Sequence, residues 1–193
     1  MITSSMAKLA EAGVVNGKKK TLHRGKIIGN FALGSQELYD FIDQNPAVWL
    51  MRGSYTNDPY VIAQNYNMIS INSAIQVDMM GQICSESMGP IQYTGTGGAA
   101  DFAIGANHAK GGKSIIAIRS TAKKGTISTI QPILTPGSIV SISRNDIDYI
   151  VTEYGIAKMR GVPVSGRVEN LINIAHPDFR DMLRAGAEQY KLW

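Results

Sequence analysis

The feature that most constrains this chain's fold is the alternation of short apolar runs with helical patterns. Helical spacing or a helix-start signal marks residues 1–13, 36–42, 60–64 and 178–190. Runs with β character, many bounded by Gly, Pro, Asn or Asp, cover residues 26–28, 31–33, 48–51, 67–72, 74–78, 114–120, 138–142 and 149–152. Strands that alternate with short helices indicate an α/β fold, with an open layered sheet and flanking helices.

Some single residues are typical of helix ends. We expect Gly13 to follow the first helix as its C-terminal cap and Ser35 to be the N-cap of the second. Pro59 suits the first turn of the third helix, and residues 176–178 suit the start of the last one. We also expect residues 48–51 to form a buried strand.

Composition excludes several classes of protein. The chain has 193 residues, 44% hydrophobic residues and a formal charge of +4, which is ordinary for a globular protein. Its cations are scattered except for Lys18, Lys19 and Lys20. We expect this lysine run to be a solvated turn, and the pattern does not favour nucleic-acid binding. No signal peptide or membrane-spanning run is evident, so the sequence favours a cytoplasmic protein.

Metal and disulfide chemistry find no support in the sequence. The single cysteine, Cys84, excludes an intrachain disulfide and any multi-cysteine metal site. We expect it to be a small buried side chain, as free cysteines commonly are. His23, His108 and His176 lack the spacing of metal ligands.

A glycine-rich stretch, GTGGAADF at residues 95–102, is the clearest candidate for chemistry. Gly95, Gly97 and Gly98 allow the backbone to come close to a bound group, so its N–H groups can meet an oxyanion or a phosphate. Ligands of such sheets bind at the carboxyl ends of the strands. We expect the glycine loop and the segment after Val151 to lie at that edge.

Nine segments in chain order resemble the C-terminal domain of the acetyl-CoA hydrolase/transferase family, with a NagB/RpiA-like CoA-transferase fold. The resemblance is strongest to 4-hydroxybutyrate and butyryl-CoA:acetate CoA-transferases. Among the segments are YTNDP at 55–59, the glycine loop, GGKSIIAI at 111–118 and VTEYG at 151–155. The others are residues 9–14, 18–23, 39–41, 70–74 and 174–180. Together they span nearly all of residues 1–193, the proposed C-terminal domain.

The resemblance implies a ping-pong transfer of CoA between an acyl-CoA and a short-chain carboxylate of the 4-hydroxybutyrate, butyrate or acetate type. A glutamate attacks the thioester and becomes a glutamyl-CoA thioester. CoA is then a substrate, and no permanently bound cofactor is expected. In the family's register, with residues 11–13 aligned, the nucleophile falls immediately before Met1. Because the chain also opens almost directly into a helix, we expect a fragment that lacks the N-terminal domain and is inactive alone. The full enzyme is expected to be a homodimer.

The resemblance also assigns residues to the site. Gly97 faces the reacting carbonyl, with Gly95 and Gly98 shaping the loop. Asn57 contacts the substrate, or alternatively forms an Asx-turn or helix cap. Two further roles rest on position in the sequence. Glu153, at the end of an apolar strand, could orient Asn57 or a substrate group, or alternatively bond nearby backbone. Lys113, after Gly111 and Gly112, could meet a CoA phosphate or pantetheine oxygen, or alternatively face solvent. The same register excludes Glu86 and Glu153 as nucleophiles.

Two other functions stay open at this stage. Water could replace the acceptor acid, which would make the protein an acyl-CoA hydrolase of the same family. A non-catalytic module that binds CoA or a nucleotide would also carry these glycines.

Overall fold

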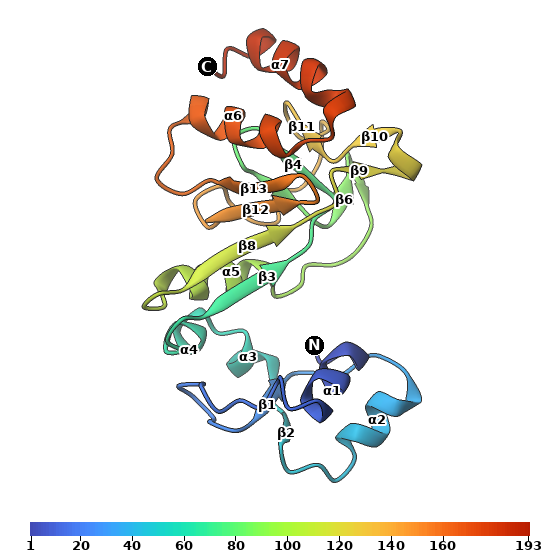
Figure 1. The fold of residues 1–193 in the computed structure, drawn as a ribbon, viewed down its shortest axis with the longest axis vertical. Helices are drawn as coiled ribbons and strands as arrows, with labels where there is room; N and C mark the ends of the chain where they lie inside the picture. Colours follow the sequence, from blue (N-terminus) through green and yellow to red (C-terminus); the bar gives the residue numbers. More distant parts are fainter.

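The computed structural model describes residues 1–193, which form two lobes (Figure 1). The N-terminal lobe, at the blue end of the colour bar, has its own small core of Ile2, Ala7, Ile27 and Leu38. Its helices and strands are α1 (Ser4–Glu11), β1 (Ile27–Gly29), α2 (Gln36–Ile42), β2 (Val48–Leu50) and α3 (Gly53–Thr56).

The larger lobe begins with α4 (Pro59–Ala63) and is built on four strands in the order β13-β12-β8-β3. Strands β3, β8 and β12 are parallel, and β13 runs antiparallel to β12. These strands and the long helices are β3 (Ile69–Asn72), α5 (Ala99–His108), β8 (Lys113–Ala117), β12 (Tyr149–Thr152), β13 (Gly155–Lys158), α6 (Val164–Ile174) and α7 (Arg180–Gln189).

Shorter elements complete this lobe. A three-stranded sheet has the order β11-β4-β5, and two small hairpins pair β6 with β7 and β9 with β10. The bounds are β4 (Gln76–Asp78), β5 (Ile83–Cys84), β6 (Ser87–Met88), β7 (Ile91–Gln92), β9 (Thr121–Ala122), η1 (Lys123–Gly125), β10 (Ile127–Ser128), β11 (Ile130–Gln131) and η2 (Pro177–Phe179).

The main core lies on one face of the four-stranded sheet. Ile116, Ile150 and Ala157 are buried there with Ala103 of α5 and Leu171 of α6. Because side chains alternate along a strand, the neighbouring residues of these strands point to the opposite face. That face is open: Ile71 is 66% exposed and Ile156 is 69% exposed. The helices therefore cover one face and leave the other to solvent.

Most elements predicted from the sequence are confirmed. Helix α2 has the predicted bounds, Gly13 follows α1 with a left-handed φ of 74°, and Pro59 starts α4. Cys84 is fully buried. The last helix begins as predicted at residues 176–178, with the 3-10 turn η2 preceding α7.

Four local predictions are wrong or need correction. Strand β2 is not buried, because Trp49 and Leu50 are 41% and 52% exposed on the edge of a two-stranded sheet. Residues 138–142 and 31–33 are not strands, and each forms only one isolated bridge, at Ile142 and Ala32. Ser35 has the extended backbone of an N-cap, but its hydroxyl bonds Ser4 instead of the helix.

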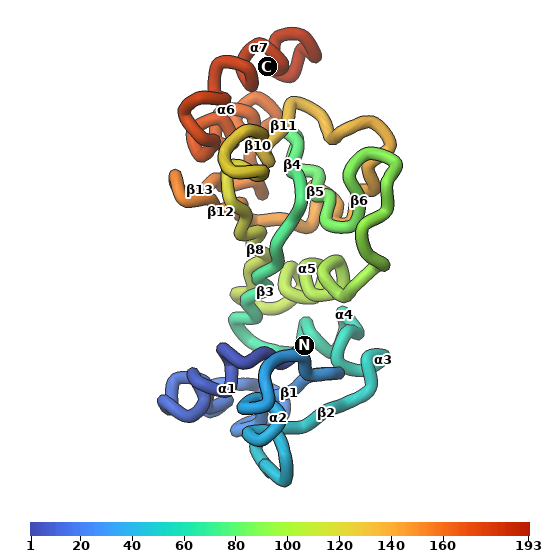
Figure 2. Tube along the Cα trace, turned by 90° about the vertical axis from the view of Figure 1, so that its right-hand side faces the viewer, coloured from blue at the N-terminus to red at the C-terminus, as the bar shows by residue number.

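No helix in the structure has the length and apolar character needed to cross a membrane. In Figure 2, the N-terminus lies on the side of the N-terminal lobe that is turned toward the larger lobe.

Candidate active site

The glycine loop leads directly into helix α5, with Gly98 as its N-cap. The N–H of Phe102 bonds the Gly98 carbonyl at 3.0 Å, whereas the N–H groups of Ala99, Ala100 and Asp101 have no partner. Unpaired N–H groups in the first turn of a helix are suited to bind negative charge. This end of α5 can therefore stabilise an anion or an oxyanion.

Asn57 lies against this loop from the end of α3. Its side-chain Oδ1 accepts a hydrogen bond from the Thr56 hydroxyl at 3.0 Å, and Nδ2 has no hydrogen-bond partner. A methyl group at Gly98 would lie 2.2 Å from Nδ2. The predicted alternative, a helix cap before Pro59, belongs to Asp58 instead, which accepts from the Tyr60 N–H at 2.8 Å. Asn57 thus offers a free amide donor beside the glycine loop.

A cavity of about 1730 Å³ between the two lobes holds these groups. This volume exceeds the roughly 300–1,000 Å³ of most small-molecule sites, so it has room for a large ligand. The cavity brings together predicted site residues and residues from both lobes, among them Met1, Lys18, Lys19, His23, Tyr55, Asn57, Asn72, Gly97, Gly98, Asp101 and Phe102. Gly95 lies just before these glycines, exposed on the loop.

Glu153 lies outside this cavity, on the turn between β12 and β13. Its carboxylate accepts hydrogen bonds from the Ser120 N–H at 3.0 Å and the Ser120 hydroxyl at 2.7 Å. Partial burial raises the pKa of Glu153, but these hydrogen bonds outweigh burial and hold the pKa below its usual value. The arrangement matches the predicted alternative of a carboxylate bonded to nearby backbone. As expected, the segment after Val151 follows the carboxyl end of β12, parallel to β3 and β8.

Lys113 stands at the amino end of β8, and the ten-residue helix α5 separates it from the glycine loop. A helix of that length spans about 15 Å. Lys113 lines a separate pocket of about 370 Å³ with Asp148, Lys158 and Arg160. The structure therefore does not bring Lys113 together with Gly97 and Asn57.

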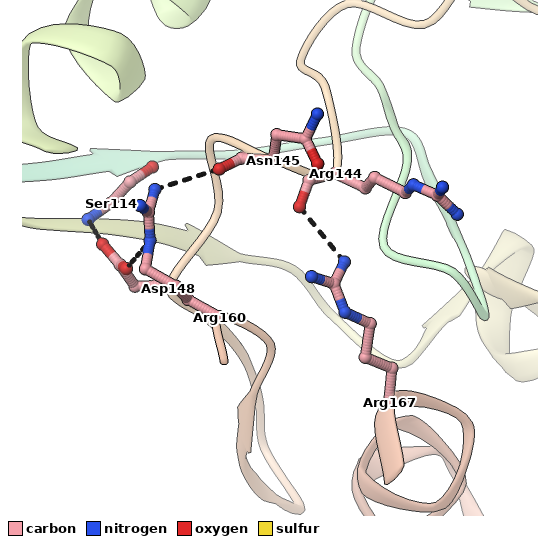
Figure 3. Close-up of polar contacts among 6 residues, drawn as sticks. All are labelled: Ser114, Arg144, Asn145, Asp148, Arg160 and Arg167. Atoms are coloured by element: carbon pink, nitrogen blue, oxygen red, sulfur yellow. Dashed lines mark hydrogen bonds and ion pairs between the residues drawn. The ribbon is translucent and has the colours of Figure 1, made fainter. Parts of the chain in front are cut away.

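Arg160 and Arg167 bind the loop at residues 144–148, which lies beside this second pocket (Figure 3). Arg160 pairs with Asp148, which also accepts from the Ser114 N–H at 2.8 Å, and Arg167 donates to the Arg144 carbonyl at 3.1 Å. Burial lowers the pKa of Arg167, and the charges of Arg144 and Arg160 lower it further. The guanidinium groups of Arg160 and Arg167 thus stabilise the conformation of this loop.

The sequence reasoning missed several residues at the main cavity. The Thr96 hydroxyl bonds the buried Glu86 carboxylate at 3.2 Å and so anchors the glycine loop. His23 Nε2 lies 2.7 Å from the Tyr55 hydroxyl, and both residues line the cavity. No sequence motif marks either pair, because each joins residues from different elements.

Asp101 is a further cavity residue with a perturbed carboxyl. Burial raises the pKa of Asp101, and the nearby charge of Asp58 raises it further. No group of three or more His, Cys, Asp or Glu side chains is placed to hold a metal ion.

Comparison with protein families gives a match over residues 34–187 to the acetyl-CoA hydrolase/transferase C-terminal domain. The 4-hydroxybutyrate coenzyme A transferase of Clostridium kluyveri is 54% identical over 183 residues, which cover 95% of this chain and 43% of that protein. The butyryl-CoA:acetate CoA-transferase of Anaerostipes caccae is 43% identical over 196 residues, covering all of this chain and 44% of that protein.

Solved structures agree. RipA from Yersinia pestis superposes with a TM-score of 0.94 at 42% identity, over all of this chain and 43% of that one. A 4-hydroxybutyrate CoA-transferase from Porphyromonas gingivalis gives a TM-score of 0.84 at 43% identity, over 98% of this chain and 44% of that one. The chain thus spans less than half the length of these relatives. It belongs to the acetyl-CoA hydrolase/transferase family and corresponds to its C-terminal domain.

Proposed function

We propose that this chain is the acyl-CoA-binding half of a CoA-transferase that exchanges CoA between an acyl-CoA and a short-chain carboxylate. The acid is of the 4-hydroxybutyrate, butyrate or acetate type, as named for several relatives. One observation carries the proposal: the free Asn57 amide and the glycine loop face the same large cavity. The partner in the complete protein is an N-terminal domain, and we place the enzyme in the cytoplasm as a homodimer.

The chemistry follows from these donors. A carboxylate attacks the thioester carbonyl, the CoA thiolate leaves, and a mixed anhydride forms. The thiolate then attacks the glutamyl carbonyl, which releases the acid and leaves a glutamyl-CoA thioester. Each attack puts negative charge on a carbonyl oxygen. The backbone N–H groups of the glycine loop and the first turn of α5, together with the Asn57 amide, would stabilise that oxygen as donors already in place before the reaction.

The nucleophile in this proposal is a glutamate joined to the amino group of Met1. Met1 lines the cavity, and the next residue, Ile2, is fully buried and bridged to Ala32. A residue attached before Met1 would therefore be joined to a residue that lines the cavity. On this account the 193-residue chain alone transfers no CoA.

The roles of Gly95, Glu153 and Lys113 stay predictions. Gly95 would leave space for the substrate at the loop. Glu153 would orient groups at the carboxyl edge of the sheet through Ser120, and Lys113 would meet a CoA phosphate only if the ligand reached the opposite edge.

The test is an exchange assay on the full-length protein that carries this chain. With butyryl-CoA and labelled acetate, we expect labelled acetyl-CoA, and Asn57→Ala should lower kcat by about 10²–10³-fold, as for the loss of an oxyanion donor. Free CoA formed without exchange would instead identify a hydrolase. Binding of CoA with neither reaction would identify a binding module.

A further inference from the structure

One wall of the cavity carries most of the cavity's charge. This wall comes from the lysine loop, defined as residues 16–26, which places Lys18, Lys19, Lys20, His23 and Lys26 on the cavity. The sequence suggested only a solvated turn here. The structure confirms an exposed turn at Lys18 and Lys19 and shows in addition that this turn lines the cavity.

Hydrogen bonds hold the backbone of the lysine loop in a defined conformation. The Gly25 N–H bonds the Gly17 carbonyl at 2.9 Å, and Arg24 Nε bonds the Lys18 carbonyl at 2.7 Å. Tyr55 holds the loop from α3 through His23, and Thr21 accepts from the Tyr66 N–H at 2.9 Å. These bonds hold the backbone from which the lysine side chains extend toward the cavity.

Two of the four lysines are already engaged. Lys20 Nζ donates to the Lys26 carbonyl at 3.0 Å, and burial lowers its pKa. Lys26 Nζ donates to the Pro46 carbonyl at 2.7 Å and lies 4.7 Å from the centre of the Trp49 ring. Lys18 and Lys19 are exposed, and neither ammonium has a hydrogen-bond or ion-pair partner.

The other residues that line the cavity supply little negative charge to neutralise Lys18 and Lys19. Asp101 is the one acidic residue among those that line it, and it lies on α5 with the glycine loop. Two unpaired ammonium groups on a fixed loop, in a concave site, concentrate positive potential where an anion would enter.

We infer that Lys18 and Lys19 bind the phosphate groups of the CoA thioester, so that the acyl end reaches Asn57 and the glycine loop. This inference rests on the proposed function, because it identifies the anion as the phosphorylated end of CoA. Ammonium groups are suitable point-charge ligands of phosphate. The inference differs from the prediction for Lys113, whose pocket lies elsewhere.

The test compares two thioesters in the full-length protein: butyryl-CoA, and butyryl-pantetheine, which lacks the phosphates. In the Lys18→Gln/Lys19→Gln variant, we expect KM for butyryl-CoA to rise at least about tenfold, the loss of one charge-assisted contact. KM for butyryl-pantetheine should change by less than about twofold. Lys8→Gln, an exposed lysine of the same lobe outside the cavity, is the matched control, and Lys113→Gln tests the competing site.

Equal KM changes for both thioesters, or a tenfold rise in Lys113→Gln alone, would overturn the inference. If the wild type catalyses exchange with neither thioester, transferring neither CoA nor pantetheine, the proposed function fails separately. Calorimetry with adenosine 3′,5′-bisphosphate then decides the role of the lysines: weaker binding in the double variant supports it, and unchanged or absent binding rejects it.

Discussion

The side-chain amide of Asn57 packs against the α-carbon of Gly98, and a methyl group at Gly98 would lie 2.2 Å from Nδ2. The contact joins α3, near the junction of the two lobes, to the start of α5. It sets the position of the one free side-chain donor beside the glycine loop.

Gly98→Ala should therefore displace Asn57, whereas Gly97→Ala should not. Because the nearest atom is the free end of the Asn57 side chain, we expect Gly98→Ala to move that amide aside at a cost of less than about 1 kcal/mol in the free energy of unfolding, and to lower kcat of the full-length protein as Asn57→Ala does. A Cβ at Gly97 meets nothing within 4 Å, so Gly97→Ala should change the free energy of unfolding by less than about 0.5 kcal/mol. Urea unfolding gives both free energies, and an unchanged kcat in Gly98→Ala would contradict this contact.

Asp101→Asn should stabilise the chain at neutral pH. Burial and Asp58 raise the pKa of Asp101 in the folded state, so the folded state holds its proton more tightly than the unfolded state. Wild-type stability therefore falls as pH rises through the interval from the unfolded value, about 3.9, to the folded one. Thermal unfolding should show a higher Tm for the variant at pH 7 and no gain near pH 3. A lower Tm at pH 7 would show that the charge is favourable at the helix N-terminus.

Glu153→Gln should show the opposite pH dependence. Hydrogen bonds from Ser120 lower the pKa of Glu153 on balance, so its contribution is complete above the unfolded value of about 4.3. The contribution is lost as pH falls through the folded value. Because the residue is exposed, the effect should stay below about 1 kcal/mol. Urea titrations at pH 7 and pH 3 measure it, with Glu188→Gln as the control, and a pH-independent difference would contradict it.

The open face of the sheet predicts a contrast between two isoleucines. Ile150→Ala should cost about 2–5 kcal/mol, because Ile150 is fully buried in the main core. Ile156→Ala should cost less than about 0.5 kcal/mol, because its side chain is 69% exposed. Similar losses in chemical unfolding would mean that the face is covered.

Much of the larger lobe was predictable from local patterns. The short apolar runs at residues 114–120 and 149–152 located β8 and β12. Helices α5 and α6 were not predicted. Strand β2 was wrongly predicted to be buried, because its burial depends on residues outside its own segment. Nothing local showed that its small sheet would leave Trp49 exposed.

The site was predictable only in part. Glycine spacing and the family resemblance led to the loop and to Asn57, but not to their mutual contact, which depends on how α3 meets α5. In the structure, Lys113 and the glycine loop lie at opposite ends of α5. The lysine run at residues 18–20 lines the main cavity. Such relationships arise from tertiary packing, so no sequence window contains them.

The most direct test of the central claim is mass spectrometry of the full-length protein after incubation with butyryl-CoA alone. The account predicts a CoA adduct on one peptide, at a glutamate joined directly to Met1, and its loss on addition of acetate. An adduct at Glu86 or Glu153, or a protein that turns over butyryl-CoA with no adduct at all, would contradict it.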